Sequence, residues 1–209
     1  MRLPTLALTT MAIALCLGPN LLSAQTKPID VNKSSLKIRV FKSGAFAAFA
    51  HDHEIEAPIG QGRIEEGKIE EGKIEEGKID SSAHASVQLR VDAHKMRVLD
   101  PDTSPGNRAD IQKTMQSSKV LDVEKFPEIA YRSTSVTSRG DSHWQVRGDL
   151  TLHGKQQPVT VDVSLQNGHY RGSASVRQTD FGIEPIRIAG GTVKVKDEVK
   201  VEFDIVPTQ

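Results

Sequence analysis

Alternation of apolar and polar residues is the feature that most limits how this 209-residue chain can fold. Successive side chains of a β-strand point to opposite faces, so each alternating row predicts a strand with one buried and one solvated face. Together with shorter rows at 129–131 and 170–176, the pattern predicts about eight strands. The clearest rows are residues 35–40, 87–92, 144–152, 159–165 and 199–205.

Turn-forming residues separate these rows, and an Asn-Gly pair between alternating rows is a strong hairpin signal. Only residues 107–118 have the apolar spacing of a helix, and they follow the helix breakers Pro101 and Pro105. Many alternating strands with one short helix favour an all-β antiparallel barrel or sandwich, and closure would protect the strand edges. The expected turns are Lys42-Ser43-Gly44, Arg139-Gly140-Asp141 and Asn167-Gly168.

Residues 1–24 have the pattern of a signal peptide. Arg2 is the only charged residue before Lys27, and an apolar stretch follows it up to Leu17. That stretch is shorter than the roughly 20 residues that a membrane-spanning helix needs. Small residues near Ser23-Ala24 would suit a signal peptidase. We therefore expect export to the periplasm or secretion, a mature domain at 25–209, and no stable membrane insertion.

Composition narrows the possible partners. The only cysteine, Cys16, lies inside the predicted signal, so the mature domain would have neither disulfides nor cysteine metal ligands. Lys and Arg together number 27, as do Asp and Glu, and the basic residues are scattered. Without a basic field, nucleic acid is not an expected partner. The oligomeric state stays open, with a dimer among the alternatives.

Residues 64–80 contain three unchanged copies of Ile-Glu-Glu-Gly-Lys, followed by Ile79-Asp80. A five-residue period matches neither a strand nor a helix, because the isoleucines would not share one face. A glycine in every unit also costs a helix about 1 kcal/mol each. We interpret the array as an expanded loop or hairpin extension, and a repeated interaction arm is the alternative.

His51-Asp52-His53 is the sharpest local motif. In a strand, His51 and His53 share a face and could reach one metal ion. A third ligand would have to come from elsewhere, and His84, His94 and His153 are candidates. The alternative is a polar patch that fixes the end of a barrel by hydrogen bonds. The motif is therefore a weak candidate metal site.

The sequence contains no convincing catalytic set. No serine stands in a Gly-x-Ser-x-Gly elbow. Gly190-Gly191 leads into an alternating row, whereas a phosphate-binding loop leads into a helix. We therefore expect neither an enzyme nor a cofactor.

Phe46 and Phe49 lie among alanines in a segment that is apolar on both faces. Such a segment could cover the end of a core or line an apolar cavity. A barrel of about eight strands can hold either side chains or one small ligand. Whether the interior is filled is therefore the central functional question.

An ordered series of short motifs resembles the YceI-like family, lipocalin-like exported proteins implicated in binding polyisoprenoids or related lipids. The segment Phe49-Ala50-His51-Asp52-His53 resembles the branch of that family that carries a His-Asp-His signature. The matching motifs lie at residues 36–40, 49–53, 120–122, 126–129, 148–154, 158–159, 181–183 and 196–199.

The resemblance implies an eight-stranded antiparallel barrel with an elongated apolar cavity and no known enzymatic activity. The leading hypothesis is thus an exported protein that binds an apolar ligand, a polyisoprenoid or other lipid. Two alternatives stay open: a metal-binding protein or metal-dependent enzyme centred on His51 and His53, and a structural or stress-response envelope protein with a packed barrel. The residues expected to contact ligand are Phe46, Phe49, His51, His53 and His153.

Overall fold

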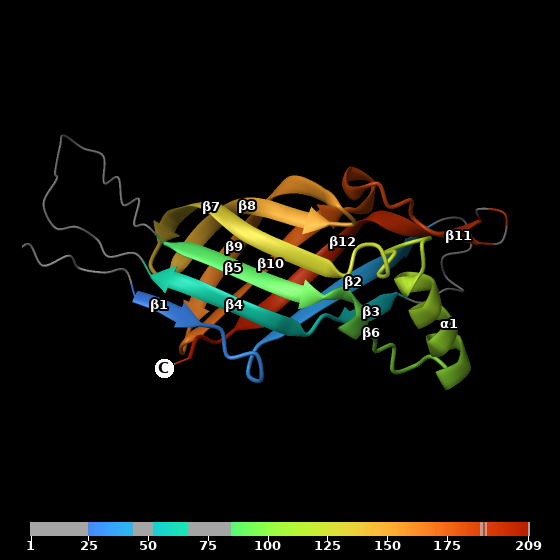
Figure 1. Ribbon diagram of the computed structural model, residues 1–209, viewed down its shortest axis with the longest axis horizontal. Coiled ribbons are helices and arrows are strands. Elements are labelled where there is room, and N and C mark those ends of the chain that lie inside the picture. Colours follow the sequence, from blue (N-terminus) through green and yellow to red (C-terminus); the bar gives the residue numbers. More distant parts are fainter. Residues whose placement is uncertain (1–24, 44–51, 67–84, 189, 191, 209) are drawn as a thin grey trace, which may run out of the picture.

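The computed structural model describes residues 25–43, 52–66, 85–188, 190 and 192–208 (Figure 1). The predicted signal peptide, Phe46, Phe49, His51 and most of the pentapeptide array lie outside these residues. The helices are η2 (Ala93–Lys95), α1 (Pro105–Gln116) and η3 (Gln178–Phe181). The strands are β1 (Gln25–Pro28), β2 (Ser35–Ser43), β3 (His53–Glu56), β4 (Ile59–Glu66), β5 (Ser86–Asp92), β6 (Arg97–Val98), β7 (Glu128–Gly140), β8 (His143–Leu152), β9 (Lys155–Gln166), β10 (His169–Arg177), β11 (Arg187–Ile188) and β12 (Val193–Ile205).

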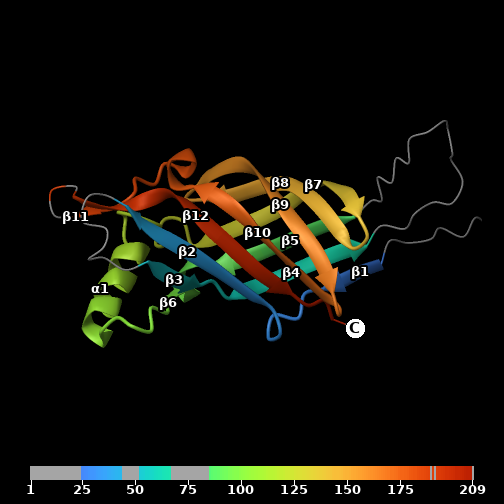
Figure 2. The ribbon, with the colours of Figure 1, turned by 180° about the vertical axis from the view of Figure 1, so that it is seen from behind.

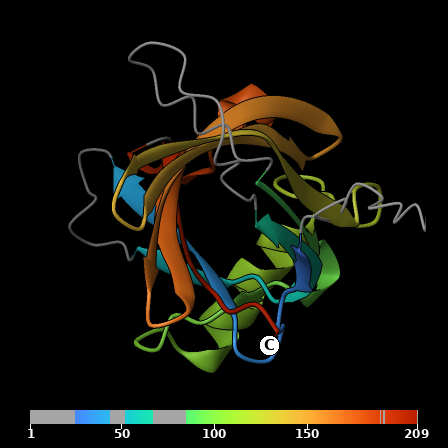
Figure 3. The ribbon, with the colours of Figure 1, turned by 90° about the vertical axis from the view of Figure 1, so that its left-hand side faces the viewer.

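The strands form one sheet that curls round into a barrel-shaped wall (Figures 1 and 3). Its order is β1-β4-β5-β7-β8-β9-β10-β12-β2-β3-β6, with β11 beside β12, and the paired strands are antiparallel. The helix α1 lies at one end of the wall (Figure 2). The predicted all-β antiparallel barrel with a short helix is confirmed.

The chain between β3 and β4 closes part of the wall. Ala57 interrupts the strand, and its amide donates to the carbonyl of Leu36 at 2.9 Å. Near the two ends of the described chain, the Asp30 amide donates to the carbonyl of Val206 at 2.8 Å, and the Thr208 amide donates to the carbonyl of Pro28 at 2.8 Å. These bonds join the start of the described chain to its end, so backbone groups that would otherwise form a free sheet edge are paired.

Alternation determines which side chains face inward. In β12, Val199 and Ile205 are buried, whereas Lys200 lies on the outer face. The outer face is held by ion pairs: Glu202 contacts Arg39 and Lys200, each at 2.8 Å. Hydrogen bonds from Lys200 and Arg39 lower the pKa of Glu202 to about 2. The barrel therefore has an apolar interior and a charged, solvated exterior.

The local predictions agree with the structure in most places. The helix begins at Pro105, and the Ser104 hydroxyl caps it by accepting from the Asn107 amide at 3.3 Å. The hairpin turn at Asn167-Gly168 is confirmed, with φ of 52° and 79°. The turn after β7 lies at Asp141-Ser142, one residue later than predicted. Within the described residues, no helix is long and apolar enough to cross a membrane.

Candidate ligand-binding cavity

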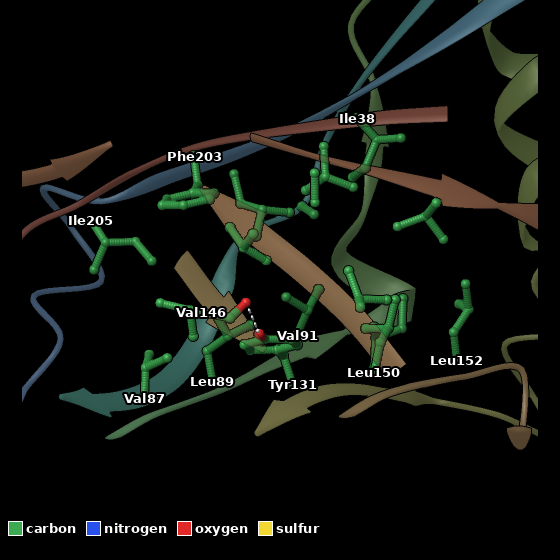
Figure 4. A pocket seen from close by; sticks show the side chains of 18 of the residues that line it. Ile38, Val87, Leu89, Val91, Tyr131, Val146, Leu150, Leu152, Phe203 and Ile205 are labelled. Carbon is green, nitrogen blue, oxygen red and sulfur yellow. Dashed lines mark hydrogen bonds between the residues drawn. The ribbon is translucent and has the colours of Figure 1, made fainter. Parts of the chain in front are cut away.

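A cavity of about 380 Å³ lies inside the barrel and receives side chains from most of its strands (Figure 4). Its wall is almost entirely aliphatic and aromatic. This volume falls within the range of roughly 300–1,000 Å³ that is usual for small-molecule sites. Side chains that typify the wall are Ile38, Leu89, Val91, Val146, Leu150, Val161, Val201, Phe203 and Ile205.

Two inward-facing glycines let aromatic rings lie against the wall. A Cβ atom on Gly148 would lie 2.6 Å from Cζ of Tyr131, and one on Gly172 would lie 2.6 Å from Cζ of Phe203. A Cβ would also meet a backbone carbonyl oxygen of the neighbouring strand, that of Arg132 at Gly148 and that of Asp162 at Gly172, so a larger residue would displace backbone as well as the ring. Such glycine–aromatic pairs are a known device in curved sheets.

Tyr131 places one hydroxyl among apolar groups of the cavity. This hydroxyl donates to the carbonyl of Val146 at 3.4 Å (Figure 4). Burial raises the pKa of Tyr131 to about 12, with a further contribution from the charge of Asp149. The phenol is therefore neutral at physiological pH, and its weakly held hydroxyl can still accept a hydrogen bond from a ligand.

The end of the cavity beside α1 is covered by tightly packed apolar residues. Met96, Met115 and Leu121 line it, and each is less than a tenth exposed. Gln112 fastens the helix there, since its Oε1 accepts from the Val98 amide at 2.8 Å and its Nε2 donates to the Met96 carbonyl at 2.8 Å. The α1 end is therefore a fixed apolar plug.

Most of the polar residues that line the cavity lie at the opposite end, beside the ends of β4 and β5, although Gln178 of η3 also belongs to the lining. We call Glu65, Glu66, Ser86 and Tyr170 the polar rim. The Tyr170 hydroxyl donates to Oε1 of Glu66 at 3.0 Å, and the Ser86 hydroxyl donates to Oε2 of Glu65 at 2.8 Å. The side chains of Glu65 and Glu66 are 32% and 37% exposed, so the cavity reaches the surface here.

Lys27 sets the charge state of the rim. Its ammonium group lies 2.9 Å from Oε2 of Glu66. This hydrogen bond lowers the pKa of Glu66, and the Tyr170 hydroxyl adds to the effect. Burial, together with the Glu66 carboxylate, raises the pKa of Tyr170 to about 12. At neutral pH the rim thus pairs an ionised carboxylate with a neutral phenol.

Trp144, the only tryptophan of the chain, lies in the wall near the rim. Its ring centroid is 6.3 Å from that of Tyr170, and the two rings are tilted by 53°. Because indole fluorescence responds to polarity, this residue offers a natural reporter of whatever enters the cavity.

The histidines predicted from the sequence lie outside this cavity, as far as the structure describes them. His153 forms the turn between β8 and β9 with a φ of 51°. Its Nδ1 lies 3.2 Å from the Phe181 carbonyl, and its ring packs edge-on against Phe126 at 4.6 Å between centroids. His153 therefore has a structural role at the α1 end. Its predicted contact with a ligand stays a prediction.

His53 lines a second, polar pocket of about 300 Å³ with Arg39, Lys42 and Asp100. Its Nδ1 lies 2.6 Å from Oδ2 of Asp100, whose side chain is only 3% exposed. Oδ1 of Asp100 accepts from the Glu54 amide at 2.8 Å. Within the described part of the chain, no cluster of three or more potential ligands could hold a metal ion. His51 lies outside it, so the paired metal site stays untested.

The sequence did not indicate the rim. Glu65 and Glu66 belong to the first pentapeptide unit, where they look like the other repeated glutamates. Only the pairing of β4 with β1 and β5, and the curl that brings β10 across, gather Lys27 and Tyr170 around Glu66.

A curled antiparallel barrel with one short helix is the architecture of a lipocalin-like barrel. A crystal structure of BcnA from Burkholderia cenocepacia has the same fold, with a TM-score of 0.63 at 19% identity over 86% of this chain and 99% of that one. The YceI-like domain model matches residues 29–206, and the chain belongs to the YceI-like family. This confirms the resemblance inferred from the motifs.

Curated relatives agree with this assignment. A UPF0312 protein of Vibrio cholerae is 29% identical over 130 residues, which are 57% of this chain and 63% of that protein. A UPF0312 protein of Pseudomonas savastanoi pv. phaseolicola is 36% identical over 88 residues, or 37% and 46% of the two chains. The chain thus spans less than two thirds of these relatives. YceI-like proteins are β-barrels that bind apolar ligands and are typically periplasmic.

Proposed function

We propose that this protein is exported and binds an apolar, chain-like molecule, a polyisoprenoid or other lipid, in the barrel cavity. The observation that carries the proposal is the cavity itself, because about 380 Å³ of the described interior is left unfilled by side chains and is walled by apolar groups. A packed structural barrel would have no such space.

The physical chemistry of this cavity favours an apolar chain. Each CH₂ group moved from water into such a wall contributes about 0.8 kcal/mol. Several carbons therefore provide useful affinity without any charged contact. Tyr131 is the one hydroxyl in the middle of the wall, and it can accept a single hydrogen bond from an oxygen- or nitrogen-bearing group.

Export forms part of the proposal and is supported by the pattern of residues 1–24. An apolar molecule that crosses an aqueous compartment needs a carrier, and a thiol-free barrel is suited to an oxidising one. Mass spectrometry of protein from the periplasmic fraction should give a mature N-terminus close to Gln25. An uncleaved chain in the cytoplasm would contradict this part.

Binding can be tested directly on the mature protein. Native mass spectrometry after gentle purification should detect a co-purified lipid. After delipidation, titration with a polyprenol should shift Trp144 emission to shorter wavelength, because the ligand replaces water beside the indole. Protein that remains empty and spectroscopically silent with every lipid supplied would overturn the proposal.

A matched pair of variants locates the binding. Val161 lines the cavity, whereas its neighbour Thr160 points outward from the same strand. We expect Val161→Phe to fill the space and weaken polyprenol binding by about tenfold or more. Thr160→Phe should leave affinity unchanged. The predicted contacts at Phe46, Phe49 and His51 can be tested by alanine substitution in the same assay, together with His53 and His153.

A further inference from the structure

The side chains that line the cavity define its depth. On β12 they run from Val199 to Ile205, and on β8 they run from Trp144 to Leu152. Figure 4 shows Ile205 and Leu152 at opposite ends of this row. A strand rises about 3.3 Å per residue and is tilted by roughly 40° in a barrel, so these spans correspond to about 15–20 Å along the barrel axis. An extended hydrocarbon chain advances about 1.3 Å per carbon, because a C–C bond is about 1.5 Å long. About 12–16 carbons therefore reach from one end to the other.

The volume of the cavity gives an independent measure of its width. A methylene group takes up about as much space as a water molecule in the liquid, roughly 30 Å³. The cavity of about 380 Å³ therefore holds on the order of a dozen carbons in total. A single extended chain already needs about that number to span the depth. The two measures agree only if the interior is about as wide as one chain.

The α1 end forms a fixed stop. Met96, Met115 and Leu121 line it, and each is less than a tenth exposed. The Leu121 amide donates to the Met115 carbonyl at 3.0 Å, which holds the segment after α1 against the helix. A tail that has reached these residues can go deeper only by displacing close-packed groups. Further carbons of a longer chain would lie beyond Ile205, past the opposite end of the described wall.

We propose that the cavity limits both the length and the number of the chains that it binds: it accepts one hydrocarbon chain to a depth of about 12–16 carbons and leaves no room for a second tail. This inference rests on the proposed function and narrows its ligand to single-chain amphiphiles or to the terminal segment of a longer polyisoprenoid. Two-tailed lipids such as diacylglycerols are excluded, because their second chain would have to stay in water.

A series of alcohols from 1-hexanol to 1-eicosanol tests the length limit. Delipidated mature protein is equilibrated with phosphatidylcholine vesicles that hold the alcohols in equal amounts, then captured on a resin, extracted and analysed by gas chromatography. While each added carbon moves from the bilayer to an apolar wall, the ratio of protein-bound to vesicle-bound alcohol should stay level. Beyond about 16 carbons the ratio should fall about fourfold per carbon, because each further carbon moves from the bilayer into water.

Monododecanoylglycerol and didodecanoylglycerol test the width in the same assay. Both carry a glycerol head, and they differ in the number of tails. Relative to its amount in the vesicles, the one-tailed glyceride should be recovered with the protein at least about tenfold more than the two-tailed one, because the second tail finds no apolar wall.

A matched pair of variants assigns the length limit to the cavity. Val159 lines the cavity, whereas its neighbour Thr160 points outward from the same strand. Phenylalanine has four more side-chain carbons than valine, so Val159→Phe should move the break in the series to chains about two to four carbons shorter. Thr160→Phe should leave the break in place. Thermal melts of both variants verify that they are folded.

The outcomes separate the two proposals. If no alcohol is recovered with the protein at any length, the proposed function fails. If the alcohols bind but the ratio stays level up to 1-eicosanol, or already falls from 1-octanol onwards, the function stands and the inference about chain length is overturned. Equal recovery of the two glycerides overturns the limit to one chain. The unsubstituted protein decides these points even if Val159→Phe does not fold.

Discussion

The α1 end and the rim end of the barrel are built from the same strands but packed in different ways. At the α1 end, Phe181 is 1% exposed and packs in a buried cluster with Met115 and Leu121. At the rim end, the small buried cluster is Ile29, Ile59 and Ile205, and the residues around it are only half-buried. A large buried cluster thus lies towards α1, whereas only a small one lies at the rim end.

This difference separates stability from binding. Free energy of unfolding comes mainly from close-packed groups, because a wall that faces empty space lacks contacts on one side. The rim end has less packing to lose and more unpaired acceptor capacity. Substitutions at the α1 end should therefore act mainly on stability, and those at the rim end mainly on ligand recognition.

The largest expected effect comes from truncating one phenylalanine in each half. Phe181→Ala should lower the free energy of unfolding by about 3–5 kcal/mol, since it empties a fully buried site. Phe203→Ala removes a ring that already borders the cavity, and we expect about half that loss. Denaturant unfolding of both variants measures the difference. Equal losses would show that the two halves are packed equally well.

A smaller difference in the free energy of unfolding is expected between alanine substitutions in two hairpin turns of similar geometry. Gly154 at the α1 end and Gly168 at the rim end have φ of 71° and 79°. Alanine in this backbone conformation costs roughly 1–2 kcal/mol at either site. At Gly154 a Cβ would also collide with the ring of Phe126, whereas nothing lies within 4 Å of one at Gly168.

We therefore expect Gly154→Ala to lose about 1–2 kcal/mol more than Gly168→Ala, from the added clash. Thermal unfolding monitored by circular dichroism gives the comparison. Because both alanines adopt similar strained dihedrals, the backbone cost cancels between them. If the two melting temperatures fall by the same amount, the packing of Phe126 on this turn is not as tight as the structure indicates.

Sequence alone predicted the regularly alternating strands better than the irregular ones. Alternating rows became β5, β8, β9, β10 and β12, because a period of two is a local property of the chain. The segments β3 and β4 were not predicted. Gly60 and Gly62 interrupt the apolar pattern of β4. A residue far away in the sequence explains Gly62, because a Cβ there would collide with the side chain of Ile29.

The candidate site was harder to predict for the same reason. Inward-facing valines and leucines are recognisable as a barrel interior, but nothing local says whether that interior is hollow. Gly148 and Gly172 leave room beside the sheet for Tyr131 and Phe203, and each of these rings comes from a neighbouring strand. The polar rim likewise depends on pairings that join residues far apart in the sequence.

Removing the side chain that attaches α1 to the barrel should change the free energy of unfolding by an intermediate amount. Gln112 makes two hydrogen bonds to backbone groups of the segment that includes β6. Gln112→Ala should cost about 1–2 kcal/mol, because the Val98 amide loses its acceptor in a half-buried site. Hydrogen exchange should become faster in α1 and at Val98 and remain unchanged at the rim.

The matched control is Gln166→Ala, an exposed residue at the rim end of β9. We expect its effect on stability to stay within about 0.5 kcal/mol. Faster exchange at the rim in Gln112→Ala would mean that the two ends open together, and the separation between them would have to be abandoned.

The smallest expected change in stability comes from the ionisation of the two tyrosines, the only ones in the chain, which line the cavity at different depths. Burial raises the pKa of both Tyr131 and Tyr170 to about 12. Ultraviolet titration of the folded protein should therefore show both phenols ionising well above the usual value of about 10. Tyr131→Phe and Tyr170→Phe assign the two steps.

The sign of the linked stability change follows from these shifts. Both folded-state pKa values lie above the unfolded value, so the contribution is complete below pH 10 and is lost as the pH rises towards about 12. We expect each tyrosine to contribute about 1 kcal/mol, because both are only partly shielded from water. In Glu66→Gln, the pKa of Tyr170 should fall while that of Tyr131 stays, since only Tyr170 donates to Glu66. A parallel fall of both would show that one electrostatic environment spans the whole cavity, and the contrast between rim and interior would then not hold.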